Sequence, residues 1–84
     1  MNVRVTITPK QGILDPQGAT VERALPALGF QGVSDVRIGK FIELSIDAPS
    51  GTTSEDLRAI VDDMCRRLLA NPIIEDYTFE LMGG

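Results

Sequence analysis

The chain has 84 residues, of which 43% are hydrophobic but only four are aromatic, and its formal net charge is -4. A chain of this size buries only roughly 60–65% of its unfolded surface, so the length predicts one domain, residues 1–84, that gains buried area by oligomerising. This net charge argues against binding to nucleic acids or anionic membranes, because both depend on a basic face. With no histidine or tryptophan, one cysteine and two lysines, most routes to catalysis at neutral pH are excluded.

The cysteine content and the N-terminus indicate a compartment. A single cysteine cannot form an internal disulfide, and residues 2–8 alternate apolar and polar side chains instead of forming the apolar run of a signal peptide. No apolar run approaches the roughly 18 residues of a membrane span. We therefore expect a soluble, cytoplasmic protein with no membrane contact.

The first two elements are predicted to be a strand and a helix. The alternation over residues 2–8 is typical of a half-buried strand, which Pro9 ends. Asp15 and Pro16 are typical of a helix start, the aspartate as N-cap and the proline as first helical residue. The apolar residues that follow recur at i, i+3, i+4 and i+7, which predicts a helix over 16–28.

The end of this helix carries two opposing signals. Gly29 followed by Phe30 predicts a left-handed C-cap with an apolar residue folded back over the last turn. Pro26 instead removes a backbone donor inside the helix. We therefore expect either a kink or a later helix start, nearer Thr20.

Residues 33–47 have the composition of strand with an interruption. Their apolar side chains share one parity, but Lys40 has the same parity and would bring a charge into the core. The pair Gly39-Lys40 is therefore either a two-residue hairpin loop of type II′ or a bulge in one long strand. The sequence leaves both arrangements open.

The C-terminal part predicts a helix and a strand. Thr52 and Glu55 are spaced as a capping box before a strongly amphipathic helix, whose acidic first turn and basic last turn match the helix dipole. An Asn-Pro pair at 71–72 ends this helix. Alternating aromatic and polar residues predict a last strand over about 74–82.

This order of elements predicts an α+β fold. The order β-α-β(β)-α-β is typical of a two-layer sandwich with an antiparallel sheet and both helices on one face, a relative of the ferredoxin-like plan. The exposed sheet face or edge is then the natural dimer surface.

Few side chains could carry chemistry. Cys65 adjoins the apolar stripe of the second helix with no histidine to activate it, which predicts a structural cysteine. The acidic residues of that helix lie mostly on its solvent side with no histidine or cysteine cluster, so we expect no metal site. Lys10 and Lys40 stand beside glycines in irregular segments without a Walker sequence. They either contact a partner or project into solvent.

Five segments, taken in order, are similar to those of a known family. They are Pro9-Lys-Gln-Gly-Ile-Leu-Asp-Pro-Gln-Gly18, Leu28-Gly-Phe30, Val33-Ser-Asp-Val-Arg-Ile-Gly-Lys40, Cys65-Arg-Arg-Leu-Leu-Ala-Asn-Pro72 and Ile74-Glu-Asp-Tyr77. Together they resemble PurS, the small subunit of bacterial and archaeal phosphoribosylformylglycinamidine synthase. The resemblance is collinear over nearly the whole chain, and Pro26 is its one departure.

The resemblance implies a role in the fourth step of purine biosynthesis, in which formylglycinamide ribonucleotide becomes its amidine with ATP and ammonia from glutamine. It implies that this chain is a non-catalytic subunit of an ATP-dependent carbon-nitrogen ligase and has no cofactor of its own. In such an enzyme ATP and Mg bind the large PurL subunit, and PurQ hydrolyses glutamine. It also implies a homodimer or dimer of dimers that bridges PurL and PurQ, so that ammonia can pass between them.

Two irregular segments supply the candidates for partner contacts under this interpretation. Some candidates also have local roles as a helix start or a bulge, whereas the three cations have no evident internal role. A dimeric ferredoxin-like regulatory module that binds a small effector is the alternative, and a small enzyme that uses Lys10 or Cys65 is a further one. The candidates are Lys10, Asp15, Pro16, Gln17, Arg37, Gly39 and Lys40.

Overall fold

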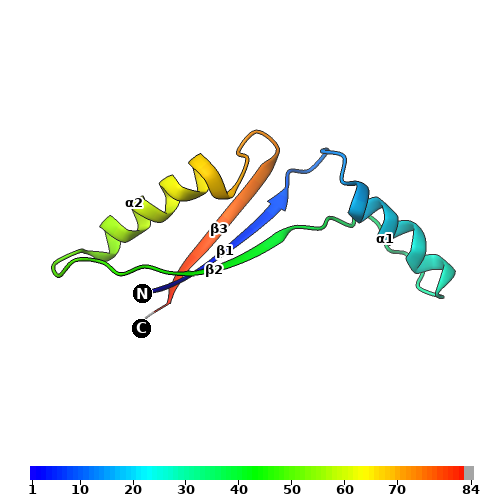
Figure 1. Ribbon diagram of the computed structural model, residues 1–84. Helices are drawn as coiled ribbons and strands as arrows, with labels where there is room; N and C mark the ends of the chain where they lie inside the picture. The colour runs from blue at the N-terminus through cyan, green and yellow to red at the C-terminus, as the bar shows by residue number, and fades with distance from the viewer. Residues whose placement is uncertain (83–84) are drawn as a thin grey trace.

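The computed structural model describes residues 1–82 and confirms the α+β class (Figure 1). Three strands form one antiparallel sheet in the order β2-β1-β3. Within residues 1–82, no helix has both the length and the apolarity to cross a bilayer. In chain order the elements are β1 (Asn2–Pro9), α1 (Pro16–Ala27), β2 (Lys40–Ser45), α2 (Ser54–Met64), the π-helical turn η1 (Cys65–Leu69) and β3 (Glu75–Met82).

The first strand, β1, is the centre of the sheet and of the core. Its apolar residues Val3, Val5 and Ile7 point to one face and are fully buried. The register places Val5 opposite Ile42 of β2 and opposite Phe79 of β3, so apolar side chains of all three strands share this face. The predicted half-buried strand is therefore confirmed, because successive residues of β1 face opposite sides of the sheet and only the apolar ones are buried.

The helix α2 covers this apolar face. Val61 is buried against the apolar residues of β1, and the buried Cys65 continues the contact into η1. Leu57, one turn before Val61, is also buried. The guanidinium of Arg58 lies 5.3 Å from the ring centre of Phe79, a cation-π contact with β3. The N–H of Ala70 donates to the carbonyl of Cys65 at 2.9 Å, the i to i-5 bond of a π-turn, and ends the helix close to the predicted place.

The capping box at the start of α2 lies one residue beyond the predicted one. The N–H of Asp56 donates to Thr53 Oγ1 at 3.1 Å, and the N–H of Thr53 donates to Asp56 Oδ2 at 3.2 Å. The predicted pair Thr52 and Glu55 is wrong, because the Thr52 hydroxyl donates to the carbonyl of Pro49 at 2.7 Å and belongs to the preceding turn.

The helix α1 ends as predicted. Gly29 has a φ of 97°, its N–H donates to Pro26 O at 3.0 Å, and the N–H of Phe30 donates to Leu25 O at 3.1 Å. These two bonds form a Schellman motif. The predicted later start near Thr20 is not present, since α1 begins at Pro16. Pro26 lies in the last turn of the helix, where its carbonyl accepts the capping hydrogen bond from Gly29.

The position of α1 differs from the predicted arrangement. The prediction placed both helices on one face of the sheet; α2 lies there, whereas α1 projects beyond the end of the sheet (Figure 1). The Cα radius of gyration is 16.7 Å and the chain extends 55 × 26 × 15 Å. A compact domain of this length would have a radius of gyration of about 12 Å. The single chain is therefore elongated, with α1 outside the sandwich.

Neither arrangement expected at Gly39-Lys40 is present. The strand β2 begins at Lys40, opposite Ile7 of β1. Residues 36–38 lie beside α1 and are hydrogen-bonded to its side chains and N-cap instead of pairing with the sheet. Gly39 lies against the backbone of β1, where a Cβ atom would come 2.1 Å from the carbonyl oxygen of Ile7. Glycine is therefore required by this close approach and not by a turn.

Candidate partner-binding site

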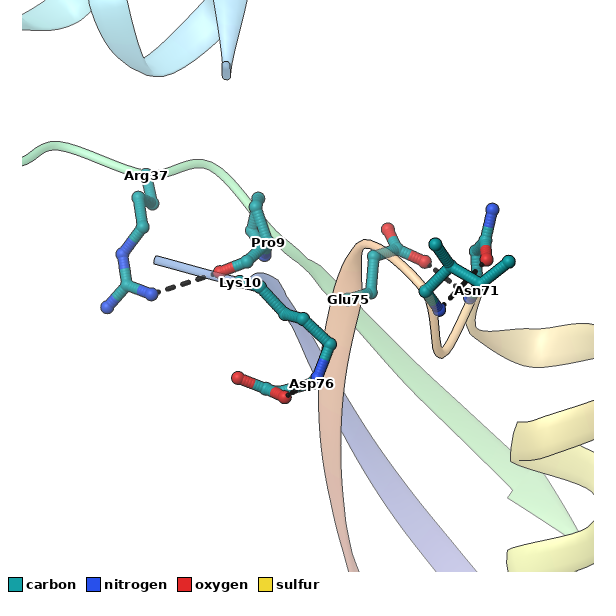
Figure 2. Close-up of polar contacts among 7 residues, drawn as sticks. Pro9, Lys10, Arg37, Asn71, Glu75 and Asp76 are labelled. Atoms are coloured by element: carbon teal, nitrogen blue, oxygen red, sulfur yellow. Dashed lines mark hydrogen bonds and ion pairs between the residues drawn. The ribbon is translucent and has the colours of Figure 1, made fainter. Parts of the chain in front are cut away.

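Cationic side chains gather at one end of the sheet, where β1 leaves for α1 and β3 begins. The antiparallel register explains the gathering, because Pro9 at the end of β1 lies opposite Glu75 at the start of β3. We call this region the junction, and Figure 2 shows most of it. It consists of Pro9, Lys10, Arg37, Lys40, Glu75 and Asp76.

Each junction cation has a partner within the chain. The Lys10 ammonium lies 2.8 Å from Asp76 Oδ1, and the Arg37 guanidinium donates to the carbonyl of Pro9 at 3.0 Å (Figure 2). Lys40 Nζ lies 3.9 Å from Glu75 Oε2. The expectation that these three cations have no internal role is therefore wrong, while their contact with a partner stays a prediction.

The two lysine pairs are weak and accessible. The side chain of Lys10 is 41% exposed and that of Lys40 is 59% exposed. Glu75 is the exception, since it is mostly covered and also accepts a hydrogen bond from the N–H of Asn71 at 2.7 Å (Figure 2). Exposed ion pairs contribute about 0–1 kcal/mol, so carboxylates of another chain could replace the present partners at little cost.

Asp15, Pro16 and Gln17 belong to a second unit, which we call the arm and define as residues 13–38. Arg37 lies in the arm and reaches the junction through its side chain, and Gly39 lies against β1, outside both units. Asp15 is the N-cap residue of α1, and its carboxylate accepts the N–H of Ile38 at 2.5 Å. The N–H of Val36 donates to Glu22 Oε1 at 3.1 Å. Two carboxylates from the α1 side thus hold residues 36–38 beside this helix.

The electrostatic state of Asp15 fits this role. The hydrogen bond from the Ile38 N–H is the main reason that the pKa of its carboxyl is lowered, and the N–H groups of Gly18 and Gln17 lower it further. Pro16 and Gln17 are exposed in the first turn. In the described part of the chain these first-turn residues form no hydrogen bond or ion pair with Lys10 or Lys40.

Sequence reasoning missed the acidic half of the junction. Glu75 and Asp76 were not among the predicted contact residues, although each forms an ion pair with a predicted one, Lys40 and Lys10 respectively. An assumed full-length antiparallel pairing of the first and last strands would have placed Asp76 opposite Thr8, next to Lys10. The signal was therefore in the register and not in any local motif.

Side chains with possible covalent chemistry lie in the core. Cys65 is fully buried, and burial, followed by the nearby charge of Asp62, raises the pKa of its thiol. Tyr77 donates its hydroxyl to Asp62 Oδ1 at 2.6 Å, and this hydrogen bond raises the pKa of the phenol. Across residues 1–82, no three metal-ligating side chains come together. The setting of Cys65 is that of a structural thiol.

The fold and the junction define a small α+β domain related to the ferredoxin-like plan, with three exposed cations and their partners at one end of the sheet. The family described as "PurS: Phosphoribosylformylglycinamidine (FGAM) synthase" matches residues 2–83. The chain belongs to this family, as its resemblance indicated.

Individual relatives agree with this assignment. The chain is 46% identical over 78 residues to the phosphoribosylformylglycinamidine synthase subunit PurS of Synechocystis sp., covering 93% of this chain and 75% of the relative. The solved structure of Bacillus subtilis PurS superimposes with a TM-score of 0.81 at 43% identity, covering 98% of both chains. A chain in the structure of PurLQS from Thermotoga maritima matches with a TM-score of 0.79 at 30% identity, covering 96% of this chain and 95% of that one.

Proposed function

We propose that this chain is the non-catalytic subunit of phosphoribosylformylglycinamidine synthase, in which it bridges a PurL-type synthetase and a PurQ-type glutaminase during purine biosynthesis. The observation that carries the proposal is the match along nearly the whole chain to a chain of PurLQS from Thermotoga maritima. In this arrangement ATP and Mg bind the synthetase, and ammonia passes between the two larger subunits. This chain contributes a single domain, residues 1–84, and acts in the cytoplasm.

The junction supports the bridging role by its chemistry. Lys40 is more than half exposed, and its 3.9 Å separation from Glu75 is long for an ion pair. Lys10 and Arg37 present two further cations at the same end of the sheet. Because exposed pairs of this kind are weak, these cations are available to acidic groups of another subunit.

The test of the junction is the affinity of Lys40→Ala for the synthetase subunit. Loss of one charged contact should weaken binding roughly two- to fivefold, while the circular dichroism and the unfolding midpoint of the isolated chain stay the same. Arg4→Ala is the matched control, because Arg4 is a half-exposed cation paired with Glu43 at 3.6 Å, several residues away along the sheet. Equal affinity of wild type and Lys40→Ala would remove Lys40 from the interface.

The test of the bridging role compares two activities of the larger subunits. Amidine formation is measured with glutamine and then with ammonia, each with and without this chain. We expect the glutamine-dependent activity alone to require the chain, because only that activity needs ammonia to move between subunits. If neither activity responds, the bridging role is wrong, and a screen of metabolites for binding to the isolated chain tests the effector-binding alternative.

A further inference from the structure

A short segment at the junction end of the molecule exposes large aliphatic side chains. We call residues 68–74, which join the end of η1 to the start of β3, the apolar turn. Leu68 and Ile73 are 83% and 82% exposed, and Ile74 is 40% exposed. Single apolar residues scattered over a surface are normal, whereas several gathered in one place mark an interaction site. The apolar turn is therefore a candidate docking element.

The core does not require these exposed side chains. In η1 and just after it, Cys65 and Ala70 are buried in the core cluster, and Leu69 packs against that cluster. Leu68 points away from this cluster and into solvent. A polar residue at position 68 would leave the core contacts unchanged, so folding does not explain the exposed leucine.

The apolar turn is held in one shape by hydrogen bonds that centre on Asn71. Its carbonyl accepts the N–H groups of Ile74 at 3.0 Å and of Glu75 at 2.7 Å. Its Oδ1 accepts the N–H of Ile73 at 3.2 Å, and its own N–H donates to Glu75 Oε1 at 2.7 Å (Figure 2). The N–H of Lys10 donates to the carbonyl of Ile74 at 2.8 Å and ties the turn to the end of β1. A surface that is ordered before binding loses little conformational entropy on binding, so this turn is preorganised.

Cations flank the apolar turn on both sides. Arg66 and Arg67 directly precede it, with side chains that are 57% and 79% exposed. On its other side the junction contributes Lys10 and Lys40. Although the net charge of the chain is -4, this end therefore presents cations that attract acidic groups of another protein. Apolar side chains flanked by charged ones are typical of the centre and rim of a protein interface.

We propose that the apolar turn anchors this chain to the synthetase-type subunit by inserting Leu68 and Ile73 into a pocket of that subunit. The chemistry of the turn requires a pocket that is apolar at its base and carries carboxylates at its rim. The inference rests on the proposed bridging function and assigns it a contact outside the segments that the sequence indicated. The synthetase is the occupant because the turn continues into the junction, where Glu75 contacts both Asn71 and Lys40, the residue proposed to contact that subunit.

A second copy of this chain fits the apolar turn poorly. In a two-fold contact through the turn, the same surface of both copies would meet, so its cations would face cations. The hollow on the sheet of this chain is lined mainly by polar side chains, those of Asn2, Arg4, Glu43 and Ser45. An aliphatic side chain gains free energy on leaving water only where its surroundings are apolar.

The first test is the affinity of Leu68→Ala and Ile73→Ala for the synthetase subunit, measured by isothermal titration calorimetry at low and at high salt. Each change should weaken binding roughly ten- to fiftyfold, because the apolar surface of the removed atoms is no longer buried. The loss should be equal at both salt concentrations, whereas the loss caused by Lys40→Ala should shrink at high salt, because salt screens only charges.

The matched control is Ile60→Ala, which shortens a 45% exposed aliphatic side chain about two turns earlier on α2. It should bind the synthetase as wild type does, and circular dichroism should show that all three variants are folded. Wild-type affinity of both Leu68→Ala and Ile73→Ala, or an equal loss in Ile60→Ala, would overturn the proposal.

The second test locates the contact. The photoreactive residue p-benzoylphenylalanine replaces Leu68 in a mixture of the three subunits, and mass spectrometry identifies the cross-linked peptides. We expect cross-links to the synthetase. If cross-links form only to the glutaminase, between copies of this chain or within one chain, or do not form at all, the proposal is overturned. The bridging role then still stands if the glutamine-dependent activity requires this chain, so the two proposals fail separately.

Discussion

Replacing Gly18 with alanine should destabilise the protein, although helix propensity alone predicts the opposite. Alanine in place of glycine inside a helix gains about 1 kcal/mol. At position 18, however, a Cβ would come 2.2 Å from the carbonyl oxygen of Val36 and 2.7 Å from Asp15 Oδ2. Backbone atoms cannot rotate away as a flexible side chain can. Residues 36–38 must therefore move away from α1.

The size of the loss follows from the contacts that this movement disturbs. Overpacking against backbone costs about 1–3 kcal/mol, and loss of the hydrogen bond from Val36 N–H to Glu22 costs about 1 kcal/mol more. After the helix gain of about 1 kcal/mol is subtracted, the free energy of unfolding should fall by about 1–3 kcal/mol.

Urea unfolding at a fixed protomer concentration measures this difference. With a slope of about 1 kcal/mol per M, the midpoint of Gly18→Ala should fall by about 1–3 M. Thr20→Ala, at an exposed position of the same helix, is the control and should leave the midpoint nearly unchanged or raise it slightly. A midpoint for Gly18→Ala equal to or above that of wild type would show that residues 36–38 do not lie against α1.

Three further results are expected. Because the pKa of Asp15 is lowered, its bond to the N–H of Ile38 stabilises the fold above the ordinary carboxyl pKa of 3.8, and this stabilisation is lost as the pH falls. The urea midpoints of wild type and Asp15→Asn should therefore differ at pH 6 and converge in acid. A difference between the two midpoints that persists in acid would contradict this. Cys65 should resist iodoacetamide at pH 8 until the protein is unfolded, as mass spectrometry would show; rapid labelling of the folded chain would contradict its burial. Because the pKa of Tyr77 is raised above 10.0, its bond to Asp62 stabilises the neutral phenol below that pH, so Tyr77→Phe should lower the urea midpoint at pH 8 and lower it less at pH 11.

The elements that depend on local pattern were predictable from the sequence. Alternation gave β1, helical spacing gave α1, and Gly29 with Phe30 gave its Schellman cap. Each of these follows from neighbouring residues and their preferred dihedral angles. The capping box of α2 was misplaced by one residue because Thr52 and Thr53 are chemically alike, and only the preceding turn distinguishes them.

The features that depend on distant segments were not predictable in the same way. Gly39 resembled a turn glycine, yet its reason is the carbonyl of Ile7, which lies far away in sequence. The candidate residues do not form one site: three cations lie at the junction, three residues of the first turn of α1 lie in the arm, and Gly39 lies against β1. The outward position of α1 was also missed, since apolar spacing shows that a helix buries a stripe but not against which surface.

The strand pairing has a consequence for synthesis of the chain. The first strand made, β1, pairs along its whole length with the last, β3, from Asn2 opposite Met82 to Pro9 opposite Glu75. On the ribosome β2 is available early, but one edge of β1 stays open until residues 75–82 have emerged. Unpaired strand edges and exposed apolar surface make nascent chains prone to aggregate. We therefore expect the sheet to stay incomplete until β3 emerges, with chaperones that hold nascent chains protecting the open edge of β1 up to that point.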